Sequence, residues 1–234
     1  MEEYKSGFDY YYTEGPDGIT LVGYFGEQEI AVAPEEIDGK PVIAIGNIEV
    51  STYEGTYAPE LVLSNSIKEI SYEAIQSPLS YSQDGWVGKL TIKENHPYFS
   101  SDGRYLFSKD GTKLICCIDR GNKDKIEIPQ TVEEIGDHAF WAMPDESLEK
   151  VVIPKTVRSI GDRAFYTGHN QEKASIIISG DLELGSDVAP TIIMNKHSGS
   201  LIVENGLLMD SERNRIFKYV GDEEAKTIQI PDTV

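Results

Sequence analysis

Cysteine is scarce in this sequence, and its uninterrupted apolar runs are short. The two cysteines, Cys116 and Cys117, are adjacent, so they cannot close an ordinary disulfide loop within the chain. The sequence is therefore no disulfide framework and gives no indication of an oxidising compartment. No stretch approaches the run of about 18 apolar residues that spans a membrane. The acidic start, residues 1–5, lacks the apolar core of a signal peptide, so we expect a cytoplasmic protein or one whose leader has been removed.

Positive charge is also in short supply. The 234 residues contain 21 Lys and Arg against 40 Asp and Glu, which gives a net charge of −19. A surface of this sign is repelled by phosphate backbones and anionic headgroups, which excludes nucleic-acid and membrane-surface binding as expected functions. The imbalance is greatest in residues 1–60, where 13 acids face only Lys5 and Lys40, and where seven of the 13 tyrosines lie.

The residue patterns of catalysis and metal binding are missing as well. None of the four histidines lies four residues from another, or at metal-ligand spacing from a cysteine or carboxylate. There is no Gly-x-Ser-x-Gly motif, phosphate-binding loop or Cys-x-x-Cys pair. We therefore expect no enzyme activity, no catalytic residues, no metal site and no cofactor. A glycan hydrolase that uses a carboxylate pair is the enzymatic alternative. Such a pair is defined by the distance between its two carboxyl groups, roughly 5 to 9.5 Å, and not by a spacing in the sequence.

What the sequence does contain is an internal repeat near its middle. The residues Ile128–Phe140 return 25 positions later as Ile153–Phe165. Both copies keep the same order of apolar, proline, glycine and alanine residues. The shared structural positions are Ile128, Pro129, Val132, Ile135, Gly136, Ala139, Phe140, Ile153, Pro154, Val157, Ile160, Gly161, Ala164 and Phe165.

Weaker copies of this unit lie on both sides. Residues 63–75 fit the order with serine in place of proline and glycine, and Ile45 lies 25 residues before their Ile70. Residues 178–185 follow at the same step with one residue deleted. The final five residues, 230–234, read Ile-Pro-Asp-Thr-Val and predict the start of an incomplete repeat.

A longer unit of apolar runs interrupts the repeats twice. In its first copy Asp110-Gly111 separates two such runs, which is a strong β-hairpin signal, and its second copy covers residues 201–217. A third hairpin is expected between residues 19–22 and 29–32. Cys116-Cys117 lies on the return arm of the first hairpin, where side chains alternate between faces, so we expect one buried and one exposed cysteine.

A 25-residue unit cannot bury its own apolar side, so stacked units must share one core. The proline ends a strand because it lacks an N–H, and the glycine allows a bend that larger residues resist. The Ala-Phe pair is expected to fill the core. The sequence therefore predicts a mostly β solenoid with a stacked parallel sheet and interposed β-hairpins. Short helical turns are expected only near residues 139–143 and 164–167.

The order Ile-Pro-x-x-Val-x-x-Ile-Gly-x-x-Ala-Phe in residues 128–140 and 153–165 resembles the leucine-rich repeats of bacterial BspA-type proteins. The segment from Gly103 to Leu114 resembles a hairpin found between such repeats. The resemblance implies a right-handed leucine-rich-repeat solenoid that serves as a binding or adhesion module. It carries over no catalytic residue, because none belongs to the repeat. Such relatives are mostly bacterial, and many are secreted or displayed on the surface.

Together these features predict a single solenoid domain over residues 1–234. Its expected parts are an N-terminal hairpin or cap (1–34), degenerate repeats (35–89), a hairpin insertion (90–127), repeats (128–189), a second hairpin insertion (190–229) and the start of an incomplete repeat (230–234). An uncovered edge at the incomplete repeat would allow a dimer through the C-terminal edge.

Exposed aromatic residues are the best candidates for ligand binding, because they offer rigid contact area that suits protein or sugar partners. The candidates are Tyr11, Tyr53, Tyr57 and Trp86, the last in a predicted loop. The alternative is that the tyrosines cap the first coil. In that case Tyr10 and Tyr12 face the core and Tyr11 faces solvent.

The sequence thus predicts a non-enzymatic protein-interaction or adhesion module of a bacterial surface or secreted protein. Its partner is expected to be a protein or glycan, without nucleic-acid binding or direct membrane insertion. An intracellular repeat scaffold is the alternative, because no signal peptide precedes the repeats and the cysteines are unpaired. The acidic first 60 residues indicate that a basic partner would bind at that end.

Overall fold

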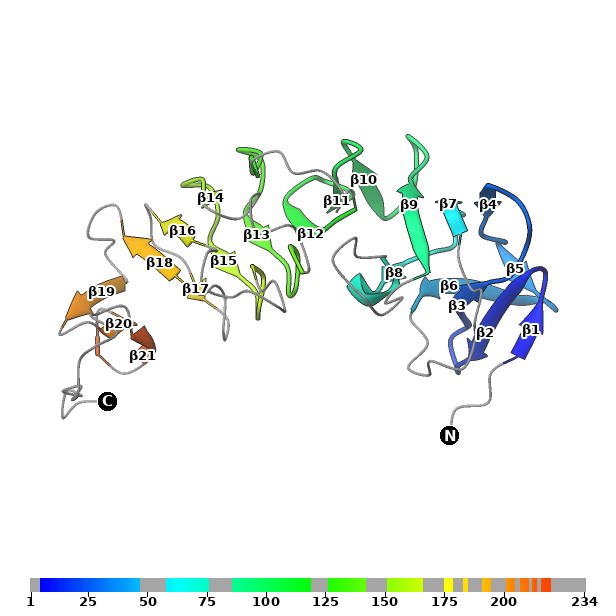
Figure 1. The fold of residues 1–234 in the computed structure, drawn as a ribbon, viewed down its shortest axis with the longest axis horizontal. Coiled ribbons are helices and arrows are strands. Elements are labelled where there is room, and N and C mark those ends of the chain that lie inside the picture. Colours follow the sequence, from blue (N-terminus) through cyan, green and yellow to red (C-terminus); the bar gives the residue numbers. More distant parts are fainter. Residues whose placement is uncertain are drawn as a thin grey trace. The chain divides into compact units, whose positions relative to one another are not determined.

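A computed structural model of the chain (Figure 1) describes 12 segments, and most of their residues lie in strands or turns. The described residues are 5–46, 58–75, 86–118, 126–141, 151–165, 175–178, 183–184, 191–194, 201–204, 207–210, 212–213 and 216–219. Within them one 3-10 helix, η1 (Tyr72–Ala74), accompanies the strands. The chain forms two compact units. Unit 1 comprises Met1–Gly111 and Cys116–Gly121, and unit 2 comprises Thr112–Ile115 and Asn122–Val234.

Unit 1 contains a first ladder of parallel strands, β3 (Ile19–Tyr24), β6 (Lys40–Ile45) and β8 (Glu69–Ile70). Leu21 pairs with Ile45, and Ile45 pairs with Ile70, which confirms the predicted 25-residue step between the two isoleucines. Two antiparallel strands, β2 (Tyr10–Glu14) and β1 (Lys5–Gly7), extend this sheet beyond β3. The short strand β5 (Glu36–Ile37) pairs antiparallel with β6.

A second parallel ladder in unit 1 joins β4 (Ile30–Val32), β7 (Ala58–Val62) and β9 (Val87–Thr91). The aligned side chains of Ala31, Leu61 and Leu90 are buried. Each coil therefore gives one strand to each ladder, and inward-facing residues of both ladders build the core. The unit also contains the antiparallel pair β10 (Phe99–Ser101) and β11 (Tyr105–Ser108).

The hairpin expected between residues 19–22 and 29–32 is wrong, because β3 and β4 belong to different sheets. The hairpin instead joins β2 to β3, where the Gly15 N–H donates to the Gly18 carbonyl at 2.8 Å. After β3 the chain wraps around the ring of Tyr24, whose hydroxyl accepts a hydrogen bond from the Gln28 N–H at 3.3 Å. That wrap carries the chain from one ladder to the other.

Unit 2 repeats the two-ladder plan. One ladder runs from β12 (Lys113–Cys117) through β13 (Glu134–Ile135) and β15 (Ser159–Ile160) to β17 (Glu183–Leu184). The other joins β14 (Val151–Val152), β16 (Ser175–Ile178) and β18 (Thr191–Met194). Ile135 pairs with Ile160 and Ile160 with Leu184, so the predicted one-residue deletion is accommodated without loss of register.

The predicted second hairpin insertion forms an antiparallel meander of three strands. These are β19 (Leu201–Glu204), β20 (Leu207–Asp210) and β21 (Ile216–Tyr219). In the first insertion the turn at Asp110-Gly111 is also present, since Gly111 has a φ of 75° and donates its N–H to Ser108. The stacked parallel strands confirm the mostly β solenoid, and its right-handedness stays a prediction.

The apolar repeat positions lie in the core. Ala139 and Ala164 are buried, and the rings of Phe140 and Phe165 stack with centroids 4.8 Å apart and planes 10° apart. Burying rings of this size contributes roughly 1.5–3 kcal/mol each. The small alanine beside each ring lets successive coils approach closely enough for the rings to stack.

The repeat glycines serve close packing between coils. A Cβ at Gly161 would lie 2.5 Å from the Asp137 backbone nitrogen and 2.8 Å from the Gly136 carbonyl carbon. The Gly161 N–H donates to Ile135, and the Gly136 N–H donates to Leu114, each at 2.8 Å. The sequence predicts glycine here for a bend. The close contact between coils is the stronger reason, because it requires a residue without a side chain.

Residues 137–141 and 162–165 form turns, and the described parts of the two predicted helical turns contain no helix. His138 and Arg163, which occupy the same repeat position, have φ angles of 54° and 51°. A left-handed residue cannot be part of a right-handed helix, so no helix runs through residues 138 and 163. Residues 142–143 and 166–167 lie outside the described part of the chain.

Both cysteines are buried, so the expectation of one buried and one exposed thiol is wrong. Neither is in a disulfide. Alternation exposes every second residue only where one face of a strand meets solvent. At Cys116 and Cys117 both faces of β12 are covered, and the Cys117 thiol donates to the Arg104 carbonyl at 3.5 Å.

Candidate interaction surface

The tyrosine-rich strand β2 alternates between core and surface. Tyr10 and Tyr12 are buried, whereas Tyr11 is half-buried, as the alternation along a strand predicts. The Tyr10 ring packs against Tyr24, with centroids 5.1 Å apart, and edge-on against Trp86 at 6.3 Å. Burial, and then the neighbouring Tyr24, raise the pKa of Tyr10 far above its usual range, so its hydroxyl stays neutral. These rings close the core of the first coil.

The outward ring of Tyr11 belongs to an aromatic surface pair. Its centroid lies 4.9 Å from that of Phe25, with the planes at 54°. The Phe25 side chain is 42% exposed, and its backbone N–H donates to the Asp9 carbonyl at 2.9 Å. This hydrogen bond fixes the start of the wrap beside the tip of the β1–β2 hairpin, so the pair sits on an ordered backbone.

Phe8 forms the tip of the same hairpin and is its most exposed ring, at 64%. It has a φ of 55° and is followed by Asp9 at 67°. A bulky side chain is uncommon in the left-handed region, which glycine, asparagine and aspartate populate more readily. An exposed, strained aromatic residue is more consistent with a contact role than with stability. The composition did not identify Phe8 and Phe25 as candidate contact residues. The tyrosines around them were the only sequence feature nearby that indicated a binding surface.

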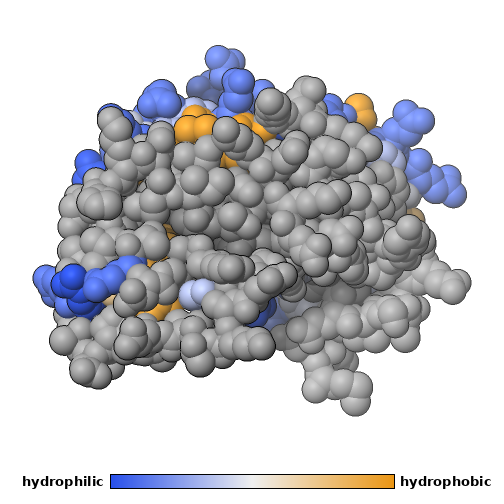
Figure 2. Space-filling view, turned by 60° about the vertical axis from the view of Figure 1, so that its left-hand side comes forward, coloured by the Kyte–Doolittle hydropathy of each residue, from blue (hydrophilic) through white to orange (hydrophobic). Residues whose placement is uncertain are grey.

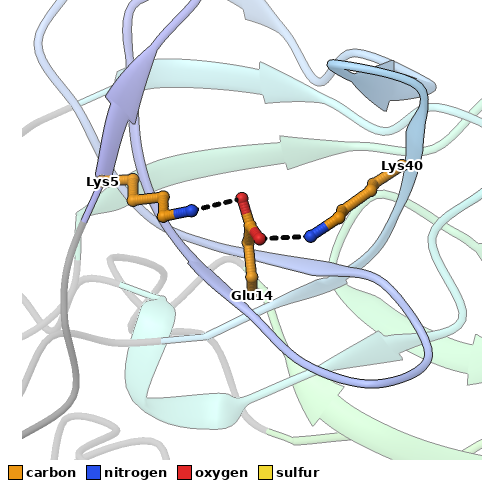
Figure 3. A network of polar contacts seen from close by, with 3 residues as sticks. All are labelled: Lys5, Glu14 and Lys40. Atoms are coloured by element: carbon orange, nitrogen blue, oxygen red, sulfur yellow. Dashed lines mark hydrogen bonds and ion pairs between the residues drawn. The ribbon is translucent and has the colours of Figure 1, made fainter.

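We call Phe8, Tyr11 and Phe25 the hairpin aromatic surface. The acid Glu14 holds its hairpin in place (Figure 3). One Glu14 oxygen accepts a hydrogen bond from the Lys5 ammonium on β1 at 2.8 Å, and the other contacts Lys40 on β6. These two ammonium groups, Lys40 first, lower the pKa of the Glu14 carboxyl. The carboxylate therefore joins three strands of one sheet.

Trp86, predicted to be a loop contact, is instead 2% exposed. Its indole N–H donates to the Gly46 carbonyl at 2.8 Å, and its ring packs against Tyr10. An apolar ring with a satisfied N–H is stable in a core, so the ring is not available to a partner. The other two predicted candidates, Tyr53 and Tyr57, lie outside the described residues.

Of the histidines that the structure describes, His96 has structural surroundings. His96 is buried, with its Nε2 2.9 Å from the Ser64 carbonyl oxygen and its Nδ1 3.3 Å from the N–H groups of Tyr98 and Phe99. Among the described residues no group of three or more His, Cys, Asp or Glu side chains could hold a metal ion. The absence of a metal site and of a cofactor remains an expectation for the whole chain.

Glu60 is the second carboxyl group with a lowered pKa, after Glu14. Hydrogen bonds from Lys89 at 2.9 Å and from Thr91 at 2.7 Å favour its charged form. The general acid of a glycan hydrolase needs the opposite shift, toward the protonated form at neutral pH. Glu14 and Glu60 therefore do not fit that role.

The surface that can be described is largely polar. On the face in Figure 2, hydrophilic residues predominate among those described, and small hydrophobic groups lie between them. No helix within the described segments is long and apolar enough to cross a membrane.

Comparisons with solved structures find several leucine-rich repeat proteins of low identity. A leucine-rich repeat protein from Eubacterium ventriosum shares 18% identity at a TM-score of 0.48, over 73% of this chain and 43% of its own. A leucine rich cell surface protein from Faecalibacterium prausnitzii shares 16% at 0.41, over 100% of this chain and 66% of its own. The pneumococcal vaccine antigen PcpA shares 13% at 0.32, over 100% and 60%.

The chain thus spans less than two thirds of the length of each of these three proteins. No curated protein matches the sequence. A family model described as "BspA type Leucine rich repeat region (6 copies)" matches residues 117–183. The match includes both strong repeat copies and the ladder from β13 to β17. Residues 117–183 of the chain are therefore similar to the BspA-type leucine-rich repeat region that this model describes.

Proposed function

We propose that the protein is a non-enzymatic protein-interaction module that binds its partner through the hairpin aromatic surface. The observation that carries this proposal is the exposed tip residue Phe8, held at a φ of 55° beside the Tyr11–Phe25 pair. Rigid aromatic side chains give much contact area at little cost in conformational entropy. The parallel ladders of unit 1 supply a stacked scaffold for such a surface.

The charge around this surface favours a basic partner. Residues 6–39 contain eight carboxylates and no Lys, Arg or His. Lys5 and Lys40, which border the segment, are both engaged with Glu14. A surface of one sign steers an oppositely charged partner and weakens with salt. The partner is therefore a protein with a lysine- or arginine-rich contact patch.

The same proposal places the module at a bacterial surface or among secreted proteins, where it serves in adhesion. The family resemblance of residues 117–183 supports this placement. An antibody to the folded chain should label intact cells of the native organism. Labelling only after the cells are broken would favour the intracellular scaffold.

The function is tested by retention of proteins on the immobilised chain, with extracts of bacterial and epithelial cell surfaces. Phe8→Asn, which removes the ring and relieves the left-handed strain, should lower retention of the bound protein at least about fivefold while raising stability. Phe25→Ser should lower retention similarly. The matched control is Tyr98→Ser, because Tyr98 is also 42% exposed but lies on another loop.

Two outcomes would remove the proposal. Either no protein is retained from any extract, or Phe8→Asn and Phe25→Ser retain the same protein as well as the native chain does. A loss of binding in Tyr98→Ser equal to that in Phe25→Ser would also count against it, because the effect would then follow exposed aromatic area in general.

A further inference from the structure

The N-terminal hairpin covers only one of the two ladders of unit 1. Strand β2, followed by β1, pairs with the outer edge of β3 and so caps the first ladder. In the second ladder β4 is the outermost strand, and no described strand pairs with its outer edge (Figure 1). Among the strands that the structure describes, the first coil is therefore capped at one sheet and open at the other.

The backbone of β4 shows which groups are left at this edge. The Glu60 N–H donates to the Glu29 carbonyl at 3.1 Å, and the Ala33 N–H donates to the Val62 carbonyl at 3.0 Å. Backbone groups of successive strand residues point in opposite directions, so those of Ile30 and Val32 point away from β7. These two residues can form the hydrogen bonds of an added strand.

The side chains at this edge are apolar and accessible. Ile30 and Val32 are 54% and 56% exposed, although both lie in a strand. In register beside them on β7 lie Glu60 and Val62. A bound strand would lie beside two aliphatic side chains, which favours apolar residues at alternate positions of the segment that binds.

Charge selects among the possible occupants of the edge. Glu27 and Glu29 precede β4 and Glu36 follows it, and all three are exposed. They belong to the segment 6–39, which has eight carboxylates and no basic residue. A second copy would bring the same charges against one another, whereas a basic segment would neutralise them.

The edge is also short, which limits non-specific pairing. Strand β4 has three residues, and Pro34, which lacks an N–H, follows soon after it. Short strands, prolines and charges are the usual means by which proteins keep an edge from aggregating. Here they restrict binding to a short segment of the right charge.

We propose that the outer edge of β4 binds an extended, lysine- or arginine-rich segment of a partner protein as an added β-strand. This inference rests on the interaction function proposed above and names the kind of segment that is recognised. The added strand extends the second ladder in the way that β2 extends the first.

The test measures the binding of a labelled peptide of about eight alternating Lys and Val residues by fluorescence anisotropy in about 50 mM salt. Val32→Pro removes an outward N–H and keeps the bonds to β7, so it should weaken binding at least about tenfold. Ile30→Lys should also weaken binding, through charge repulsion. The matched control is Val152→Lys, because Val152 on β14 is 57% exposed and should leave binding unchanged.

A second comparison needs no variant. The same peptide, N-methylated at every residue, cannot donate along either edge and should lose binding, as should a peptide with Glu in place of Lys. Equal binding of the N-methylated or the acidic peptide would overturn the proposal, as would unchanged binding by Val32→Pro. Self-association that Val32→Pro abolishes would assign the edge to a second copy and overturn it as well. If the retention of a partner protein depends on Phe25 but not on Val32, the proposed function holds, but the outer edge of β4 takes no part in it.

Discussion

At the scale of single residues, the solenoid depends on the positions where one coil touches the next. Gly161 lies against the backbone of residues 136–137, and the contact leaves no space for a methyl group. His96 lies in a different kind of contact, where one ring is hydrogen-bonded on both nitrogens. Each of these two contacts leads to a prediction about the stability of the fold.

Gly161→Ala should destabilise the fold by about 1–3 kcal/mol, because the new Cβ meets backbone atoms at 2.5 and 2.8 Å and one coil must shift. The measurement is the urea midpoint of unfolding. Gly15→Ala is the control, since its Cβ would lie at an ordinary 3.6 Å from the Gly18 oxygen. Equal midpoints for the two variants would contradict close packing as the reason for the glycine.

His96 should make stability depend on pH. Burial lowers the pKa of its ring, although the bond to the Ser64 carbonyl opposes the shift. Below the unfolded pKa of about 6.5 the unfolded chain binds a proton that the folded chain excludes, so stability falls as pH decreases toward the lowered folded pKa. The loss is at most about 1.4 kcal/mol per pH unit. It should be measurable as the difference in unfolding free energy between native chain and His96→Asn from pH 7 to 5, and parallel curves would refute it.

At the scale of elements, the β1–β2 hairpin is a separate addition to the ladder. Its attachment includes the ion pairs of Glu14 with Lys5 and Lys40 and the buried rings of Tyr10 and Tyr12. The rings bind it to the core and the ion pairs lie at the surface. Loss of the ion pairs should therefore loosen the hairpin locally without unfolding the unit.

Glu14→Gln should speed the hydrogen exchange of the β1 amides and leave the global unfolding midpoint nearly unchanged. Exposed ion pairs are screened by salt, so about 1 M NaCl should have the same effect on the native chain. Lys89→Gln, which breaks the Lys89–Glu60 pair on another sheet, is the control and should not change β1 exchange. If β1 exchanges equally slowly in all three proteins, the carboxylate does not hold the hairpin.

The pairing of the strands also shows which sequence patterns predict partners well and which do not. The repeat predicted the partners of Ile135 and Ile160, because identical coils place identical residues in register. The third hairpin was wrong, because apolar runs 19–22 and 29–32 alternate equally well in one sheet or in two. The turn at residues 15–18 brings β2 and β3 together, and its Gly-Pro-Asp-Gly sequence already indicates a turn.

At the scale of the whole molecule, the organisation into one domain remains a prediction. In strand β12, residues Lys113–Ile115 belong to unit 2, and Cys116–Cys117 belong to unit 1. One continuous strand thus carries residues of both units. If the solenoid is a single domain, neither unit should unfold alone.

The two tryptophans provide the measurement, because Trp86 lies in unit 1 and Trp141 in unit 2. Each tryptophan is followed separately by its fluorescence during unfolding in urea. The Trp141→Phe variant retains only Trp86, and the Trp86→Phe variant retains only Trp141. Coincident transitions, after correction for the stability of each variant by circular dichroism, are expected. Two separated midpoints would show that the chain consists of two domains.

The sequence by itself determined the step of 25 residues, the parallel register and the buried repeat positions, because each coil must hide the same apolar side against its neighbour. Tertiary structure decided what the other aromatic residues do. Trp86 entered the core, whereas Phe8 and Phe25 stayed outside, and composition treats all three alike. It also decided that the hairpin caps one ladder and leaves β4 open. Such outcomes depend on which chain segments meet in space, and a local pattern holds no information about segments distant in the chain.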